Sequence, residues 1–126
     1  MTAPEHFKME DGYASYRPVG KVSLQEAVLL ATNAITYARE NQIRRLLINC
    51  TGLTGFGSPK TLDRFQMAEQ WARAGQSMVK LSVVAAAELI DPEKFGMTVA
   101  RNRGLLGNIF SDEAEALAWL LDPNAS

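Results

Sequence analysis

The chain has 126 residues, of which 47% are hydrophobic and 21% charged, and this composition predicts one compact soluble domain over residues 1–126. A net charge of −1 gives no overall field that would draw the protein to nucleic acid. No apolar run reaches the roughly 20 residues of a membrane-spanning helix. The start has no apolar signal core and the single cysteine excludes an internal disulfide, so we expect a cytoplasmic location.

Two antiparallel strands are predicted first, over residues 7–10 and 13–22. They flank Asp11-Gly12, a dipeptide that favours a tight hairpin turn. Pro18 lacks the backbone donor that a regular strand needs, so we expect the second strand to be interrupted there.

The clearest predicted helix spans residues 23–41. Ser23 and Glu26 have the spacing of a capping box, in which each side chain accepts a hydrogen bond from the other residue's backbone N–H. Leu29 is among the residues that widen its apolar face. The face itself follows spacings of three and four and consists of Leu24, Ala27, Val28, Ala31, Ile35 and Ala38.

A buried strand at 46–50 leads into a glycine-rich loop in the middle of the chain, reading LLINCTGLTGFGSPKT. The glycines permit positive φ and the close approach of a neighbouring backbone. Ser58 and Pro59 form an N-cap and first-turn pair, so a helix should begin there. Such a helix start suits an anion, a phosphorylated serine or a partner's carboxylate.

The helix after this loop is predicted over 59–74, with Gly75 placed to end it. Arg64 lies on its polar side, which we expect to face solvent. A buried strand rich in Val and Ala follows at 79–87. The buried stripe of the helix would consist of Leu62, Phe65, Ala68, Trp71 and Ala72.

A third helix is predicted over 91–103, with Asp91 as its cap, Pro92 at its first position and Gly104 after its end. Gly96 inside it costs about 1 kcal/mol relative to alanine. We therefore expect this helix to be intrinsically the weakest of the four.

A short strand at 105–110 and a helix that starts at 111–113 complete the pattern, and an Asp-Pro pair at 122–123 ends it. The order β-β-α-β-α-β-α-β-α predicts an α/β fold in which four helices pack on a mixed sheet of about five strands. The stripe of the last helix would consist of Ala114, Leu117, Ala118 and Leu121.

The element order and the loop together resemble the STAS domain, specifically the SpoIIAA-like branch related to anti-sigma-factor antagonists. The most specific part is DPEKFGMTVARNRG followed by an aromatic strand end and SDEAEALAWL. The resemblance implies a STAS-like fold and a regulatory role. In that family the loop after the central strand bears a regulatory serine within an Asp-Ser-Ser-Gly stretch. Here Ser58 matches the first serine, while Gly57 and Pro59 replace the aspartate and the second serine.

The first candidate site is this loop and helix start, made of Thr51, Thr54, Gly57, Ser58 and Lys60. As a functional site it would bind a protein partner or a second copy of the chain. A purely structural interpretation remains open, because Ser58 can act as an N-cap and the threonines can form hydrogen bonds within turns.

The second candidate site is the 91–104 helix, with Phe95, Met97, Val99, Arg101 and Arg103. Phe95 and Val99 share a face and Met97 points elsewhere, so the helix should be poorly anchored. The arginines can be solvated cations near the helix carbonyls. Alternatively the helix moves, opens an apolar cleft or touches lipid, since the SpoIIAA-like branch is related in fold to lipid-carrying SEC14-type domains.

The residue inventory gives little support to catalysis. His6 is the only histidine, and Cys50 has no basic partner nearby in the sequence. No spacing of His, Cys or acidic residues specifies a metal site. We expect a nonenzymatic regulatory or interaction module, without cofactor, that uses the 54–60 loop. The alternative is a carrier of a small apolar or lipid-like ligand with reversible membrane association.

Overall fold

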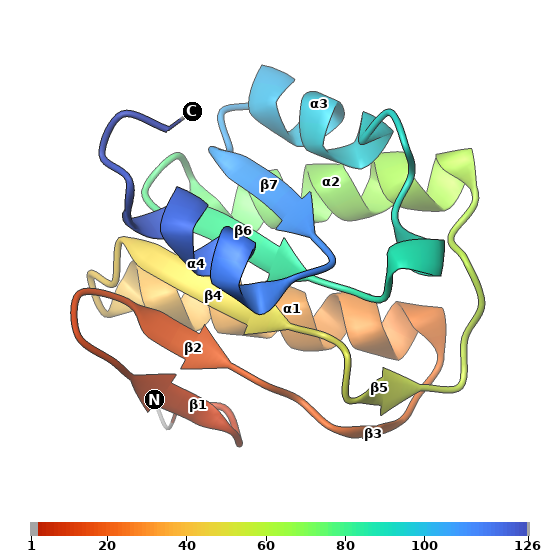
Figure 1. Ribbon diagram of the computed structural model, residues 1–126, viewed down its shortest axis with the longest axis horizontal. Helices are drawn as coiled ribbons and strands as arrows, with labels where there is room; N and C mark the ends of the chain where they lie inside the picture. Colours follow the sequence, from red (N-terminus) through yellow and green to blue (C-terminus); the bar gives the residue numbers. More distant parts are fainter. Residues whose placement is uncertain (1–2, 126) are drawn as a thin grey trace.

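The computed structural model describes residues 3–125. Its main sheet has five strands in the order β1-β2-β4-β6-β7 (Figure 1). β1 (Phe7–Met9) runs antiparallel to β2 (Ala14–Tyr16), and β4 (Arg45–Asn49), β6 (Lys80–Val84) and β7 (Gly107–Phe110) continue the sheet in parallel. The predicted α/β class, with a mixed sheet of five strands and four helices, is confirmed.

The helices divide unequally between the two faces of this sheet. α1 (Leu24–Glu40), α2 (Thr61–Gly75) and α3 (Phe95–Asn102) share the larger core on one face, whereas α4 (Glu113–Leu121) packs on the other (Figure 1). Each parallel crossover steps to the next strand in the same direction. Because such crossovers are right-handed, their helices all fall on one face.

Alternation along β4 connects the two cores. Leu46 and Ile48 belong to the core under α1, α2 and α3, whereas Leu47 between them belongs to the cluster under α4. All three side chains are at most 1% exposed. Successive side chains of a strand point to opposite faces, so this short apolar run serves both layers.

A second, two-stranded parallel sheet lies beside the main one. It pairs β3 (Gly20–Lys21) with β5 (Leu53–Thr54), so the segment predicted as a loop contains a strand. The interruption predicted near Pro18 is confirmed, because β2 ends before it and β3 begins after it. Gly55 has φ +104, and a Cβ there would lie 2.6 Å from the carbonyl oxygen of Val22. Only glycine permits this close approach.

The start of α1 agrees with its prediction. Ser23 Oγ accepts a hydrogen bond from the Glu26 N–H at 3.1 Å, and Glu26 Oε1 accepts one from the Ser23 N–H at 3.0 Å. This is the reciprocal capping box, formed by residues three apart in the chain.

The predicted caps of α2 and α3 are wrong. Lys60, not Ser58, precedes the first turn of α2, and its N–H donates to Asp63 Oδ2 at 2.9 Å. α3 begins at Phe95 instead of Pro92, after Lys94 in a left-handed conformation with φ 51. Asp91 still reaches this start, because its Oδ2 accepts the Phe95 N–H at 2.8 Å.

The strand predicted over 79–87 is also shorter than expected. β6 ends at Val84, and a 3-10 turn, η1 (Ala87–Leu89), follows it.

The predicted stripes of α1 and α2 are confirmed in their central parts, because Ala31, Ile35 and Ala38 of α1 and Ala68, Trp71 and Ala72 of α2 are buried. Other predicted apolar positions are not covered. Leu29 and Leu62 are 56% and 65% exposed, although both were expected to be buried. In α4 the buried residues are Ala116 and Leu120, whereas Ala114, Ala118 and Leu121 of the predicted stripe are exposed and Leu117 is half-buried. The periodicity of apolar residues identifies a helix, but the position at which the helix packs on the sheet decides which face of the helix is buried.

Candidate functional site

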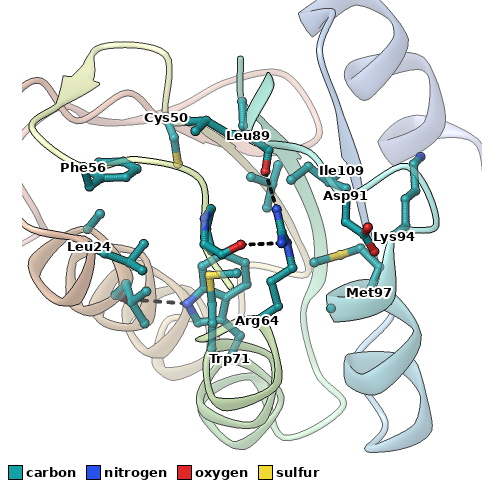
Figure 2. Close-up of a pocket in the computed structure, with 17 residues that line it drawn as sticks. Leu24, Cys50, Phe56, Arg64, Trp71, Leu89, Asp91, Lys94, Met97 and Ile109 are labelled. Atoms are coloured by element: carbon teal, nitrogen blue, oxygen red, sulfur yellow. Dashed lines mark hydrogen bonds between the residues drawn. The ribbon is translucent and has the colours of Figure 1, made fainter. Parts of the chain in front are cut away.

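A small cavity lies at the carboxyl ends of the parallel strands (Figure 2). Its volume is about 90 Å³. Cys50 follows β4, Ala85 follows β6 and Ile109 lies in β7, and all three line the cavity. α1, α2 and α3 supply the remaining walls together with two loops. Ligands of open α/β sheets bind at this end, outside the carboxyl ends of the strands.

The walls of the cavity are mainly apolar. Trp71 Nε1 donates to the Val28 carbonyl at 3.4 Å, so the one polar atom of the indole is satisfied. Met67 and Met97 come from α2 and α3, and their unbranched thioethers adapt to different ligand shapes. The other main apolar contributors are Leu24, Ala27, Phe56, Pro59, Val83 and Leu89.

Arg64, in the first turn of α2, extends into the middle of this site (Figure 2). Its NH1 donates to the Pro59 carbonyl, and its NH2 donates to Ser58 Oγ at 3.3 Å and to the Leu89 carbonyl at 3.0 Å. It therefore ties the loop before α2 to η1. The expectation that Arg64 faces solvent is wrong, because the carbonyls of these two irregular segments take its donors.

Asp91 and Lys94 supply the other charges in the lining. Asp91 accepts from the backbone of Phe95, as described above. Lys94 Nζ donates to Asn108 Oδ1 at 2.9 Å and lies 4.8 Å from the centroid of the Phe110 ring. Two cations and one carboxylate thus line an otherwise apolar cavity.

Cys50 is the one thiol at the site, and Figure 2 shows its sulfur directed toward the cavity. Burial raises the pKa of this thiol to about 12. Because the thiolate is the nucleophile, a cysteine that stays protonated at neutral pH is a poor one.

The residues of the first candidate site do not converge. Ser58 is bonded to Arg64 at the cavity, whereas the Thr51 hydroxyl donates to Asn49 Oδ1 at 2.6 Å. Thr54 lies in β5, and Thr51, Thr54, Gly57, Ser58 and Lys60 are all exposed. The loop therefore presents an exposed edge, but its hydroxyls belong to separate hydrogen-bond networks.

The network around Thr51 continues onto the α4 face. Asn49 Nδ2 donates to Glu113 Oε1 at 3.0 Å, and Arg17 NH2 donates to the same oxygen at 2.8 Å. The Asn49 hydrogen bond is the largest cause that lowers the pKa of Glu113, with Arg17 adding to it. This cluster stabilises the start of α4 and does not line the cavity.

The five residues of the second candidate site, on and beside α3, lie in different environments. Met97 and Val99 are both buried, at 5% and 7% exposure, so the expectation that Met97 points away from the buried face of this helix is wrong. Phe95 remains 37% exposed. Arg101 Nε donates to the Gly107 carbonyl at 3.1 Å, and Arg103 pairs with Glu69 at 3.1 Å. Of these five residues, Met97 alone lines the cavity.

Sequence reasoning missed most of the cavity. Arg64 and Trp71 were interpreted only as parts of a helix, and Met67 and Phe56 were not singled out. A signal was present, because parallel strands predict a site at their carboxyl ends, and Cys50 and Phe56 follow such a strand.

Comparisons with known proteins give the chain no family. No family model matches the sequence, and no curated protein matches it. Among residues 3–125, no three His, Cys, Asp or Glu side chains gather as they would to hold a metal ion. Within the same residues, no helix is both long enough and apolar enough to cross a membrane.

Proposed function

We propose that this protein is a nonenzymatic binding module whose cavity at the carboxyl end of the sheet takes a small ligand with an apolar body. The observation that carries the proposal is the cavity itself, which Trp71 and Met67 line from α2 and Met97 lines from α3. Ligand sites are typically concave and mostly apolar, with a few polar groups that fix orientation. Arg64, Asp91 and Lys94 are such groups here.

The volume limits the ligand. An engineered apolar cavity of about 150 Å³ binds benzene, and the present cavity, at about 90 Å³, is smaller. A short branched chain or part of a ring fits this space, whereas a long acyl chain would extend out of it into solvent unless α3 or the 56–60 loop moved. The proposal therefore favours a small metabolite over a membrane lipid.

The lining also supports a role without catalysis. It contains no histidine, and burial keeps Cys50 protonated, with a pKa of about 12. General base catalysis needs a group poised to take a proton within hydrogen-bond reach of a nucleophile. Asp91 is the one carboxylate in the lining, and the lining contains no serine, threonine or tyrosine hydroxyl that it could activate.

Methionine methyl NMR tests the proposal directly. Met67 and Met97 line the cavity, whereas Met9 and Met78 are 59% and 61% exposed and do not. Titration with 4-methylpentan-1-ol should shift the methyl signals of Met67 and Met97 and leave those of Met9 and Met78 unchanged. Equal shifts at all four methionines, or none at Met67 and Met97, would contradict the proposal.

A pair of adjacent substitutions provides a second readout. Val28→Phe places extra volume in the cavity, whereas Leu29→Phe adds it at a position that is 56% exposed. Val28→Phe should abolish the methyl shifts, and Leu29→Phe should preserve them. Native mass spectrometry of freshly purified protein would then identify any ligand carried from the cell.

A second candidate function is protein interaction through the 54–60 loop. It is favoured by the exposure of Thr54, Gly57, Ser58 and Lys60, which flank the cavity-lining Phe56 in the sequence. Occupancy of the cavity would then alter the surface that a partner contacts. In a capture experiment, Ser58→Glu should weaken a specific complex while melting temperature changes little, because an acid is acceptable near a helix start. Ser111→Glu, exposed before α4 on the other face, is the control.

A further inference from the structure

The charge of Arg64 is not neutralised by any carboxylate of the described chain. The ion pairs among residues 3–125 involve Lys8, Arg17 and Arg103 as cations, and Arg64 is in none of them. Its three acceptors are two carbonyls and a hydroxyl, all neutral. Arg64 is half-buried beside apolar walls, and all its hydrogen-bond acceptors in the described protein are neutral.

Arg64 also has N–H groups that form no hydrogen bond within the described chain. A guanidinium has five N–H groups, and the three hydrogen bonds to Ser58, Pro59 and Leu89 use three of them. Lys94 adds a second cation to the lining, held by the neutral Asn108 amide. Asp91 is the one acid there, so the lining has an excess of one positive charge.

We infer that the cavity takes a small monocarboxylic acid, with its apolar body against Trp71, Met67 and Met97 and its carboxylate at Arg64. The inference rests on the proposed function and names the ligand class for that site. Guanidinium and carboxylate form charge-assisted hydrogen bonds, roughly twice as strong as neutral ones. Their attraction grows where apolar walls exclude water. The space suits a body of about four to six carbons.

Three probes with one body and different head groups test this inference: 4-methylpentanoate, 4-methylpentan-1-ol and 4-methylpentylamine. Their dissociation constants are measured at pH 7 from the Met67 and Met97 methyl shifts. The carboxylate should bind about tenfold or more tightly than the alcohol, and the amine should bind weakest. Salt should reduce the preference for the carboxylate.

Variants then assign the preference to Arg64. Arg64→Gln should lower carboxylate affinity to that of the alcohol and leave alcohol affinity within about twofold, and Arg73→Gln, exposed on the same helix, should change neither. If Arg64→Gln does not fold, Arg64→Lys keeps the charge without the planar fork and should retain part of the preference.

The outcomes separate the inference from the proposed function. Equal binding of carboxylate and alcohol by the wild type overturns the carboxylate assignment and leaves an apolar site in place. Tightest binding of the amine also overturns it and makes Asp91 the recognising group. A failure of all three probes to shift Met67 and Met97 removes the proposed function together with the inference.

Discussion

The two faces of the main sheet are closed in different ways. On one face a single helix, α4, covers a compact cluster of Leu47, Val84, Ala116 and Leu120. On the other face three helices share a much larger core, yet a cavity remains between them and the carboxyl ends of the strands. The cavity therefore belongs to the larger layer, and the helical residues that line it come from α1, α2 and α3 and not from α4.

Side-chain size explains part of this difference. Ala31, Ala34 and Ala38 line the buried side of α1, and Ala68 and Ala72 that of α2, so the middle of the layer can pack closely. At the start of α1, Leu24 and Val28 are only half-buried and face the cavity. We therefore assign stability to the close-packed middle of this helical layer. The proposed ligand binding is assigned to the end of the layer where α1 begins.

The largest effect is expected from a substitution that disrupts the core under α1, α2 and α3. Ile48→Asp buries a carboxylate at a position that is 0% exposed, with an expected cost above about 4 kcal/mol. The variant should show no cooperative thermal transition by circular dichroism. Leu62→Asp, at a position 65% exposed in the first turn of α2, should unfold almost as the wild type does.

The α4 face should respond to a smaller change. Leu120→Ala removes a side chain that is 0% exposed and should lower the free energy of unfolding by about 2–5 kcal/mol in denaturant titrations. Leu121→Ala, the neighbour at 37% exposure, should cost less than about 1 kcal/mol. Similar losses for the two variants would mean that α4 does not pack as described.

A substitution at the α2–α3 contact should stabilise the protein. A Cβ at Gly96 would lie 3.6 Å from Arg64 Cβ, an ordinary contact distance. Gly96→Ala should therefore gain about 0.5–1 kcal/mol from helix propensity. Gly104→Ala is the opposite control, because φ +93 and a Ser77 Oγ at 2.6 Å make a side chain there unfavourable. A loss of stability in Gly96→Ala would contradict the spacing of α2 and α3.

The smallest effect concerns acid stability on the α4 face. The hydrogen bond from Asn49, followed by Arg17, lowers the pKa of Glu113 from 4.5, so its ionised form is favoured in the folded state. This contribution to stability is present above the ordinary glutamate pKa and is lost as pH falls through the lowered one. Unfolding titrations in this acid range should show a shallower pH slope for Glu113→Gln than for the wild type. The exposed Glu115→Gln should keep the wild-type slope.

Local signals predicted the fold well. The capping box of Ser23 and Glu26 was correct because both partners lie within one turn. Ser58 has equally suitable chemistry, but Asp63 pairs with the Lys60 N–H and Arg64 draws Ser58 and Pro59 toward η1. Here long-range contacts override a plausible local cap.

The cavity was hidden from the sequence for a related reason. Its lining extends from Leu24 to Ile109, and no two of its charged residues have a spacing that marks a motif. Arg64 looked like a solvent-facing residue because it is charged and lies outside the predicted apolar stripe of its helix. The folded chain brings α2 beside η1, and this contact gives the Arg64 guanidinium the Leu89 carbonyl as an acceptor.

The order of the strands across the main sheet is their order in the chain. During synthesis, each parallel strand that leaves the ribosome therefore finds its neighbour already present. The last helix to emerge, α4, covers Leu47 and Val84, which belong to strands made much earlier. A nascent chain that ends before Glu113 therefore presents a bare apolar sheet face, and this is the stage at which chaperones would be needed most.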